Sequence, residues 1–108
     1  MIVTIHPDAE SDVVEAAAFY EQAGSPALAA RFVAEFRRVT QLIAQNPGIG
    51  TPRARGRQFF PFRIFPYGLI YLTRPEDIHI LVARRDRRGP GFGGARKPAG
   101  FGGTSGDA

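Results

Sequence analysis

The hydrophobic and polar positions at the start of the chain predict a strand followed by a helix. Residues 2–5 are all β-branched and mostly apolar, which favours a short strand. His6-Pro7 ends this strand, because proline cannot continue a hydrogen-bonded ladder. Residues 8–22 have the composition of a helix. Its predicted apolar face holds Val13, Ala16, Ala17 and Tyr20.

A second helix is predicted from Pro26 to Gln45. Ser25-Pro26 is a start signal, since a serine side chain caps free backbone N–H groups and proline suits the first helical position. Asn46-Pro47-Gly48 ends the helix. Apolar residues recur every three or four positions and form one stripe of Leu28, Phe32, Phe36, Val39 and Ile43. The short connection between the two helices predicts an antiparallel hairpin.

The second half of the chain contains short apolar runs separated by turn residues. These runs predict three strands, at residues 57–64, 69–74 and 78–84. Phe65-Pro66-Tyr67-Gly68 is the expected turn between the first two, with proline second and glycine fourth. Pro61 indicates an edge strand or a bulge. Residues 49–56 are expected to form a loop.

The element order is therefore β-α-α-β-β-β, which predicts an α+β fold. The antiparallel helical hairpin should pack on one face of a small, mainly antiparallel sheet. We expect one folded domain at residues 1–88. Residues 89–108 contain eight glycines and little apolar surface, which predicts a disordered tail.

The composition narrows the classes of site that the chain could carry. It contains no cysteine and two histidines far apart in sequence, so we expect no disulfide, no metal site and no cofactor. No apolar run reaches the ~18 residues that a membrane span needs. The N-terminus lacks the basic segment of a signal peptide. We therefore expect a cytoplasmic protein with no membrane partner.

The charge is unevenly distributed along the chain. Residues 1–48 hold three Lys and Arg against six Asp and Glu, a net charge of −3, whereas residues 49–108 hold eleven against four, a net charge of +7. Because arginine suits forked contacts with phosphate and carboxylate, this half predicts an acidic or polyanionic partner. The predicted binding residues are Arg53, Arg55, Arg57, Arg63, Tyr67, Arg84, Arg85, Arg87 and Arg88.

Groups suited to acid–base catalysis are few. The sequence has no phosphate-binding glycine loop, and no serine is placed for a nucleophilic triad. The carboxylate pairs Asp8/Asp12 and Glu76/Asp77 are predicted to be surface features. His79 is the side chain of the second half best suited to proton transfer. Its alternation with Ile78 and Ile80 predicts an exposed histidine with no partner.

Several motifs, in order and at characteristic spacing, resemble those of the RelE/ParE superfamily of type II toxin–antitoxin toxins, closest to its ParE-like branch. They are His6-Pro7, Ala18-Phe19-Tyr20, Ala29-Ala30-Arg31-Phe32, Asn46-Pro47, Phe62-Arg63-Ile64-Phe65-Pro66-Tyr67-Gly68, Val82-Ala83-Arg84-Arg85 and Arg87-Arg88-Gly89-Pro90-Gly91-Phe92. The resemblance implies a toxin that a small acidic antitoxin neutralises. RelE-like members cut ribosome-bound mRNA, whereas ParE-like members inhibit DNA gyrase.

Three departures from the RelE-like pattern favour the ParE-like class, whose members inhibit DNA gyrase. Gly68 stands where RelE-like sequences carry an arginine, Val82 where many relatives have a histidine, and Phe92 where a tyrosine often lies. The leading interpretation is a non-enzymatic toxin that binds a protein target, with DNA gyrase as the expected target. One alternative is a ribosome-dependent mRNA endonuclease that uses Arg63, Arg85 and His79. The other is a basic nucleic-acid-binding module without toxicity.

Overall fold

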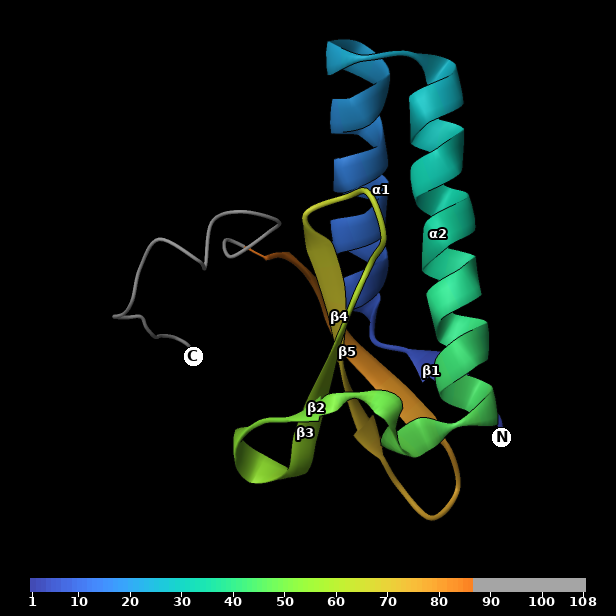
Figure 1. The fold of residues 1–108 in the computed structure, drawn as a ribbon, viewed down its shortest axis with the longest axis vertical. Coiled ribbons are helices and arrows are strands. Elements are labelled where there is room, and N and C mark those ends of the chain that lie inside the picture. The colour runs from blue at the N-terminus through green and yellow to red at the C-terminus, as the bar shows by residue number, and fades with distance from the viewer. Residues whose placement is uncertain (87–108) are drawn as a thin grey trace.

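Two antiparallel helices cover one face of a five-stranded sheet (Figure 1). The computed structural model describes residues 1–86, so the predicted tail and the predicted site residues Arg87 and Arg88 lie outside the described residues, as does Phe92. The strands are β1 (Val3–Ile5), β2 (Thr51–Pro52), β3 (Arg57–Pro61), β4 (Tyr67–Thr73) and β5 (Ile78–Arg85). The helices are α1 (Pro7–Ala23) and α2 (Pro26–Gln45), with short 3-10 turns η1 (Pro47–Ile49) and η2 (Ala54–Gly56).

The strand order confirms the predicted α+β fold. The sheet runs β1-β5-β4-β3-β2, with β1 parallel to β5 and every other neighbouring pair antiparallel. Strands β3, β4 and β5 form the predicted meander. β1, the first strand of the chain, pairs with β5, the last strand. This pairing brings Thr4 and His79 into register, although they are more than seventy positions apart in sequence.

Side-chain caps start both helices. The Ser25 hydroxyl accepts a hydrogen bond from the Leu28 N–H at 3.1 Å, and Pro26 follows it as the first residue of α2, as predicted. His6 caps α1, its Nδ1 accepting from the Asp8 N–H at 3.0 Å. No helix within residues 1–86 has the length and apolarity that crossing a membrane requires.

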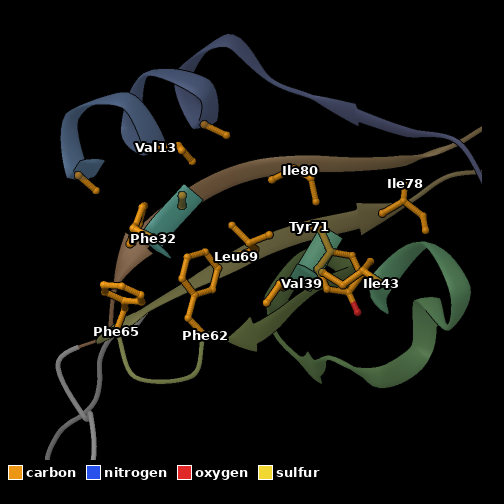
Figure 2. Packing of buried hydrophobic residues seen from close by; sticks show 13 residues of the cluster. Val13, Phe32, Val39, Ile43, Phe62, Phe65, Leu69, Tyr71, Ile78 and Ile80 are labelled. Atoms are coloured by element: carbon orange, nitrogen blue, oxygen red, sulfur yellow. The ribbon is translucent and has the colours of Figure 1, made fainter. Parts of the chain in front are cut away.

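The core lies between the helical hairpin and the sheet (Figure 2). Phe32, Val39 and Ile43 from the predicted stripe of α2 are fully buried. They meet side chains from alternate positions of β4 and β5, namely Leu69, Tyr71, Ile78 and Ile80, which are also fully buried. Burying one such aliphatic or aromatic side chain contributes about 1.5–3 kcal/mol to folding.

The predicted position of the β3–β4 turn is wrong by two residues. The chain reverses at residues 63–66, and both Tyr67 and Gly68 belong to β4. The physical reason is burial, because the rings of Phe62 and Phe65 both enter the core and force the reversal to occur between them. β3 accordingly ends at Pro61, three residues earlier than predicted. The predicted 49–56 loop also contains β2, η2 and the end of η1.

Candidate functional site

The predicted basic surface is divided between the two ends of the sheet. Arg57 pairs with Leu72 of β4, whereas Arg84 and Arg85 pair with Gly68 and Tyr67. Leu72 and Gly68 are four residues apart, which is roughly 13 Å along a strand. We call Arg63, Tyr67, Arg84 and Arg85 with the 63–66 turn the hairpin end. We call Arg53, Arg55 and Arg57 the β2–β3 end.

At the hairpin end, the aromatic residues connect the turn to α1. The ring of Tyr20 lies 5.0 Å from that of Phe65 and 6.2 Å from that of Tyr67, measured between centroids. Burial raises the pKa of the Tyr20 phenol, and Tyr67 raises it further, while the charge of Arg85 acts in the opposite direction. Both Arg84 and Arg85 are exposed, so their guanidinium groups are available to a partner.

Glu35 of α2 holds the turn of the hairpin end in place. Its carboxylate accepts hydrogen bonds from the Arg38 side chain at 2.8 and 2.6 Å and from the backbone N–H of Arg63 at 2.6 Å. The Arg38 hydrogen bonds are the largest reason why the pKa of Glu35 lies below its ordinary value. Sequence reasoning missed this residue. The available signal was a single acidic residue in α2 with an arginine three positions later.

At the β2–β3 end, arginine packs on an aromatic ring. The Arg53 guanidinium carbon lies 4.8 Å from the centroid of Phe59, and the Arg53 N–H donates to the carbonyl of Arg57 at 2.7 Å. The Phe59 ring also covers Gly68, where an added Cβ would come within 2.3 Å of it. A larger residue at position 68, such as the arginine of the RelE-like pattern, would therefore displace Phe59.

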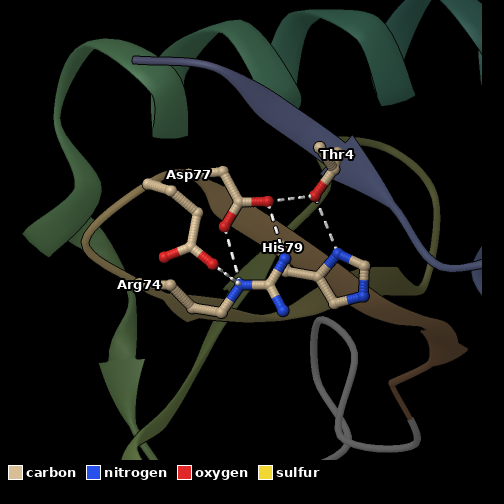
Figure 3. Close-up of polar contacts among 5 residues, drawn as sticks. Thr4, Arg74, Asp77 and His79 are labelled. Carbon is tan, nitrogen blue, oxygen red and sulfur yellow. Dashed lines mark hydrogen bonds and ion pairs between the residues drawn. The ribbon is translucent and has the colours of Figure 1, made fainter.

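His79 has partners in the structure, so its prediction as an exposed, uninvolved residue is wrong. It is half-buried, and its Nδ1 lies 2.8 Å from the hydroxyl of Thr4, which in turn donates to Asp77 at 2.5 Å (Figure 3). The Thr4 hydroxyl has one hydrogen, which it uses to donate a hydrogen bond to the carboxylate. It therefore accepts a hydrogen bond from Nδ1–H of His79, which assigns a ring hydrogen to Nδ1.

Asp77 is buried, which corrects the prediction that the Glu76/Asp77 pair is a surface feature. The residue is 5% exposed, and its carboxylate accepts two hydrogen bonds from Arg74, both at 2.7 Å. Bonds from Arg74 and then from Thr4 lower the pKa of the Asp77 carboxyl to about 2. The Asp12 carboxylate also has a partner in the fold, because it accepts a hydrogen bond from the Ala83 N–H at 3.1 Å.

The three residues assigned to a nuclease do not lie together. His79 pairs with Leu72 of β4 and Arg85 with Tyr67, so about 17 Å of strand separates them. Arg63 lies in the turn at the hairpin end, which is the same end of the sheet as Arg85. Within residues 1–86, no three His, Asp or Glu side chains are placed to share a metal ion.

A groove of about 550 Å³ lies between the two helices and ends at β1. Its apolar walls come from Ile5, Val13, Val14, Ala17, Ala18, Ala29, Val33 and Phe36. Glu10, Glu21 and Arg37 add charged groups to its lining. Ile5 and Val14 are among the most exposed large apolar side chains of residues 1–86. Sequence reasoning assigned Val13, Ala17 and Phe36 to apolar helix faces but did not predict this groove, because the groove depends on how the two helices pack together.

Comparison with known proteins gives a family and a related structure. The family described as ParE toxin of the type II toxin–antitoxin system parDE matches residues 3–88. A solved structure titled "Chromosomal ParDE TA system from P. aeruginosa" has the same fold, with a TM-score of 0.71 and 19% sequence identity. The match covers 79% of this chain and 95% of that one. No curated protein sequence gives a significant match.

Proposed function

The chain belongs to the ParE toxin family of type II toxin–antitoxin systems, and we therefore propose that it arrests bacterial growth by binding DNA gyrase and that a cognate antitoxin neutralises it. The observation that carries the proposal is the family match over residues 3–88. The separation of His79 from Arg63 and Arg85 supports a binding role rather than cleavage, because general acid–base chemistry needs those groups within reach of the same phosphate.

The two surfaces of the structure suit two partners. The hairpin end presents the exposed guanidinium groups of Arg63, Arg84 and Arg85, which suit carboxylates on a protein target. The groove between α1 and α2 has mostly apolar walls, which suit the apolar side of an antitoxin segment. Because these surfaces use different residues, target binding and neutralisation can be separated by mutation.

Charge reversal at the hairpin end tests the proposal. The chain should arrest growth when expressed alone in a bacterial host, and the purified protein should inhibit supercoiling by gyrase. Arg84→Glu with Arg85→Glu should abolish both effects. Arg31→Glu is the control for charge reversal at a single exposed arginine, since Arg31 lies on α2 outside the hairpin end, and it should leave both effects in place.

Other results would contradict the proposal. Normal supercoiling at saturating wild-type protein would exclude gyrase as the target. Cleavage of mRNA on ribosomes, with supercoiling intact, would support the endonuclease alternative instead. Growth arrest that co-expression of a cognate antitoxin does not relieve would contradict neutralisation.

A further inference from the structure

Ile64 adopts a backbone conformation that isoleucine rarely takes. Its φ angle is +72°, in the left-handed region, where a β-branched residue is an outlier. The N–H of Phe65 donates to the carbonyl of Arg63 at 2.7 Å, so Ile64 is the central residue of a γ-turn with positive φ, a strained type. Glycine or asparagine would satisfy this turn at a lower free-energy cost.

The surrounding structure holds this strained turn firmly. Phe62 and Phe65, on either side, are buried against the ring of Phe32, with centroid distances of 5.4 and 5.1 Å. The Glu35 carboxylate accepts a hydrogen bond from the backbone N–H of Arg63 at 2.6 Å. The Ile64 side chain is thereby directed away from the core and is 75% exposed, the largest exposed fraction among the large apolar residues of the described chain.

The isoleucine side chain therefore adds strain and exposure to the free toxin and contributes little to its core. Strained residues that several surrounding contacts hold in place tend to lie at functional sites. An exposed aliphatic side chain at the tip of a rigid turn has the form of a binding anchor, because it loses little conformational freedom when it enters a pocket.

Charge around Ile64 indicates the kind of partner. Arg63 precedes it, and Arg84 and Arg85 are exposed on the strand that pairs with β4 at this end. The carboxylates nearby are Glu35, which is bound to Arg38, and the half-buried Asp86. The hairpin end thus has an aliphatic tip and exposed arginines, one beside the tip in the turn and two at the end of β5, on opposite faces of the sheet. Such a tip suits an acidic protein surface better than a nucleic acid, because isoleucine offers no aromatic face for base stacking.

We propose that Ile64 is the apolar anchor by which the hairpin end enters a pocket on the toxin's protein target, with Arg63, Arg84 and Arg85 pairing with carboxylates around that pocket. This inference rests on the proposed function and specifies the part of the toxin that makes the contact. Asparagine is the informative replacement, since it accepts positive φ and lacks the aliphatic anchor.

The test compares Ile64→Asn with Ile2→Asn, the same change at another exposed isoleucine, which lies outside both the hairpin end and the groove. Inhibition of purified gyrase and growth arrest are measured for both variants and the wild type. Ile64→Asn should melt at or above the wild-type temperature and should need at least about tenfold more protein for half-inhibition. Ile64→Leu should retain most of the activity, and Ile2→Asn should inhibit like the wild type.

The outcomes separate this inference from the proposed function. If the wild type neither inhibits gyrase nor arrests growth, the proposed function fails. If the wild type is active and Ile64→Asn stays within twofold of it in both assays, the anchor role of Ile64 is overturned. If the wild type arrests growth without inhibiting gyrase, growth arrest alone decides between the variants. Loss of binding to a single-stranded RNA probe in Ile64→Asn, with both toxin activities intact, would also overturn the anchor role.

Discussion

The hydroxyl of Tyr71 ties the centre of the sheet to the chain that leaves α2. It donates a hydrogen bond to the carbonyl of Pro47 at 2.7 Å and accepts one from the N–H of Gly50 at 3.0 Å. The Tyr71 ring is fully buried, and burial raises the pKa of its phenol despite the hydrogen bond from Gly50. One phenol oxygen thus pairs with two backbone groups of the chain after α2, the carbonyl that begins η1 and the N–H of the residue that follows η1.

Tyr71→Phe should destabilise the fold while the core remains packed. The change keeps the ring but leaves the buried N–H of Gly50 and the carbonyl of Pro47 without this partner. A cost of about 1–3 kcal/mol is expected for such an unsatisfied group. Urea denaturation followed by circular dichroism measures it. Tyr67→Phe, the same change in the same strand but half-buried, should cost less; equal costs would show that the two hydrogen bonds contribute little.

Gly68→Ala should be far more costly than Gly48→Ala. A Cβ at position 68 would lie 2.3 Å from Cζ of Phe59 and 2.8 Å from the carbonyl of Phe60, so the ring must move. Overpacking of this kind costs typically about 1–3 kcal/mol. At position 48 an added Cβ meets nothing within 4 Å. Thermal melting compares the two variants, and similar melting temperatures would show that Phe59 relocates freely.

Asp77 should contribute stability that depends on pH. Its pKa is lowered from 3.8 to about 2, so the ionised form stabilises the folded state. This contribution is fully present above about pH 4 and is lost as pH falls toward 2. Asp77→Asn should therefore be less stable than the wild type at pH 7, and the difference should shrink as pH falls from 4 to 2.

Denaturation series at several pH values measure this difference. Glu76→Gln is the control, because this exposed carboxylate lies 3.8 Å from Arg74 in the same turn and exposed ion pairs contribute little. If the wild type stays more stable than Asp77→Asn by a constant free energy of unfolding down to pH 2, the lowered pKa of Asp77 would be contradicted.

Ser25→Ala should weaken the start of α2. The serine hydroxyl caps the Leu28 N–H at 3.1 Å, and losing such a cap costs typically about 1 kcal/mol. Ser25→Gly should cost only a few tenths of a kcal/mol, because glycine is itself tolerated at the cap. Chemical denaturation of both variants checks the order, and the reverse order would show that the cap does not set the stability of this helix.

Local physics explains why sequence reasoning located the two helices and the meander. A serine cap, an apolar stripe and a terminating Asn46-Pro47-Gly48 are all short-range signals, and α2 has the predicted bounds. The β-branched and aromatic runs likewise predicted four of the five strands with errors of a few residues, and only the two-residue β2 was missed. Where the expectation failed, as at the β3–β4 turn, core burial of Phe62 and Phe65 overrode the preference of a Pro-Tyr-Gly sequence for a turn.

The chain by itself therefore determined the element order, the basic second half and the arginines that a partner could meet. Only the tertiary structure decided how these residues are grouped. Strand register separated Arg57 from Arg84, and pairing of β1 with β5 placed Thr4 beside His79. The contact of Glu35 with Arg63 depends on how α2 lies over the turn. Such contacts join residues distant in sequence, and no short-range propensity specifies which register or packing brings them together.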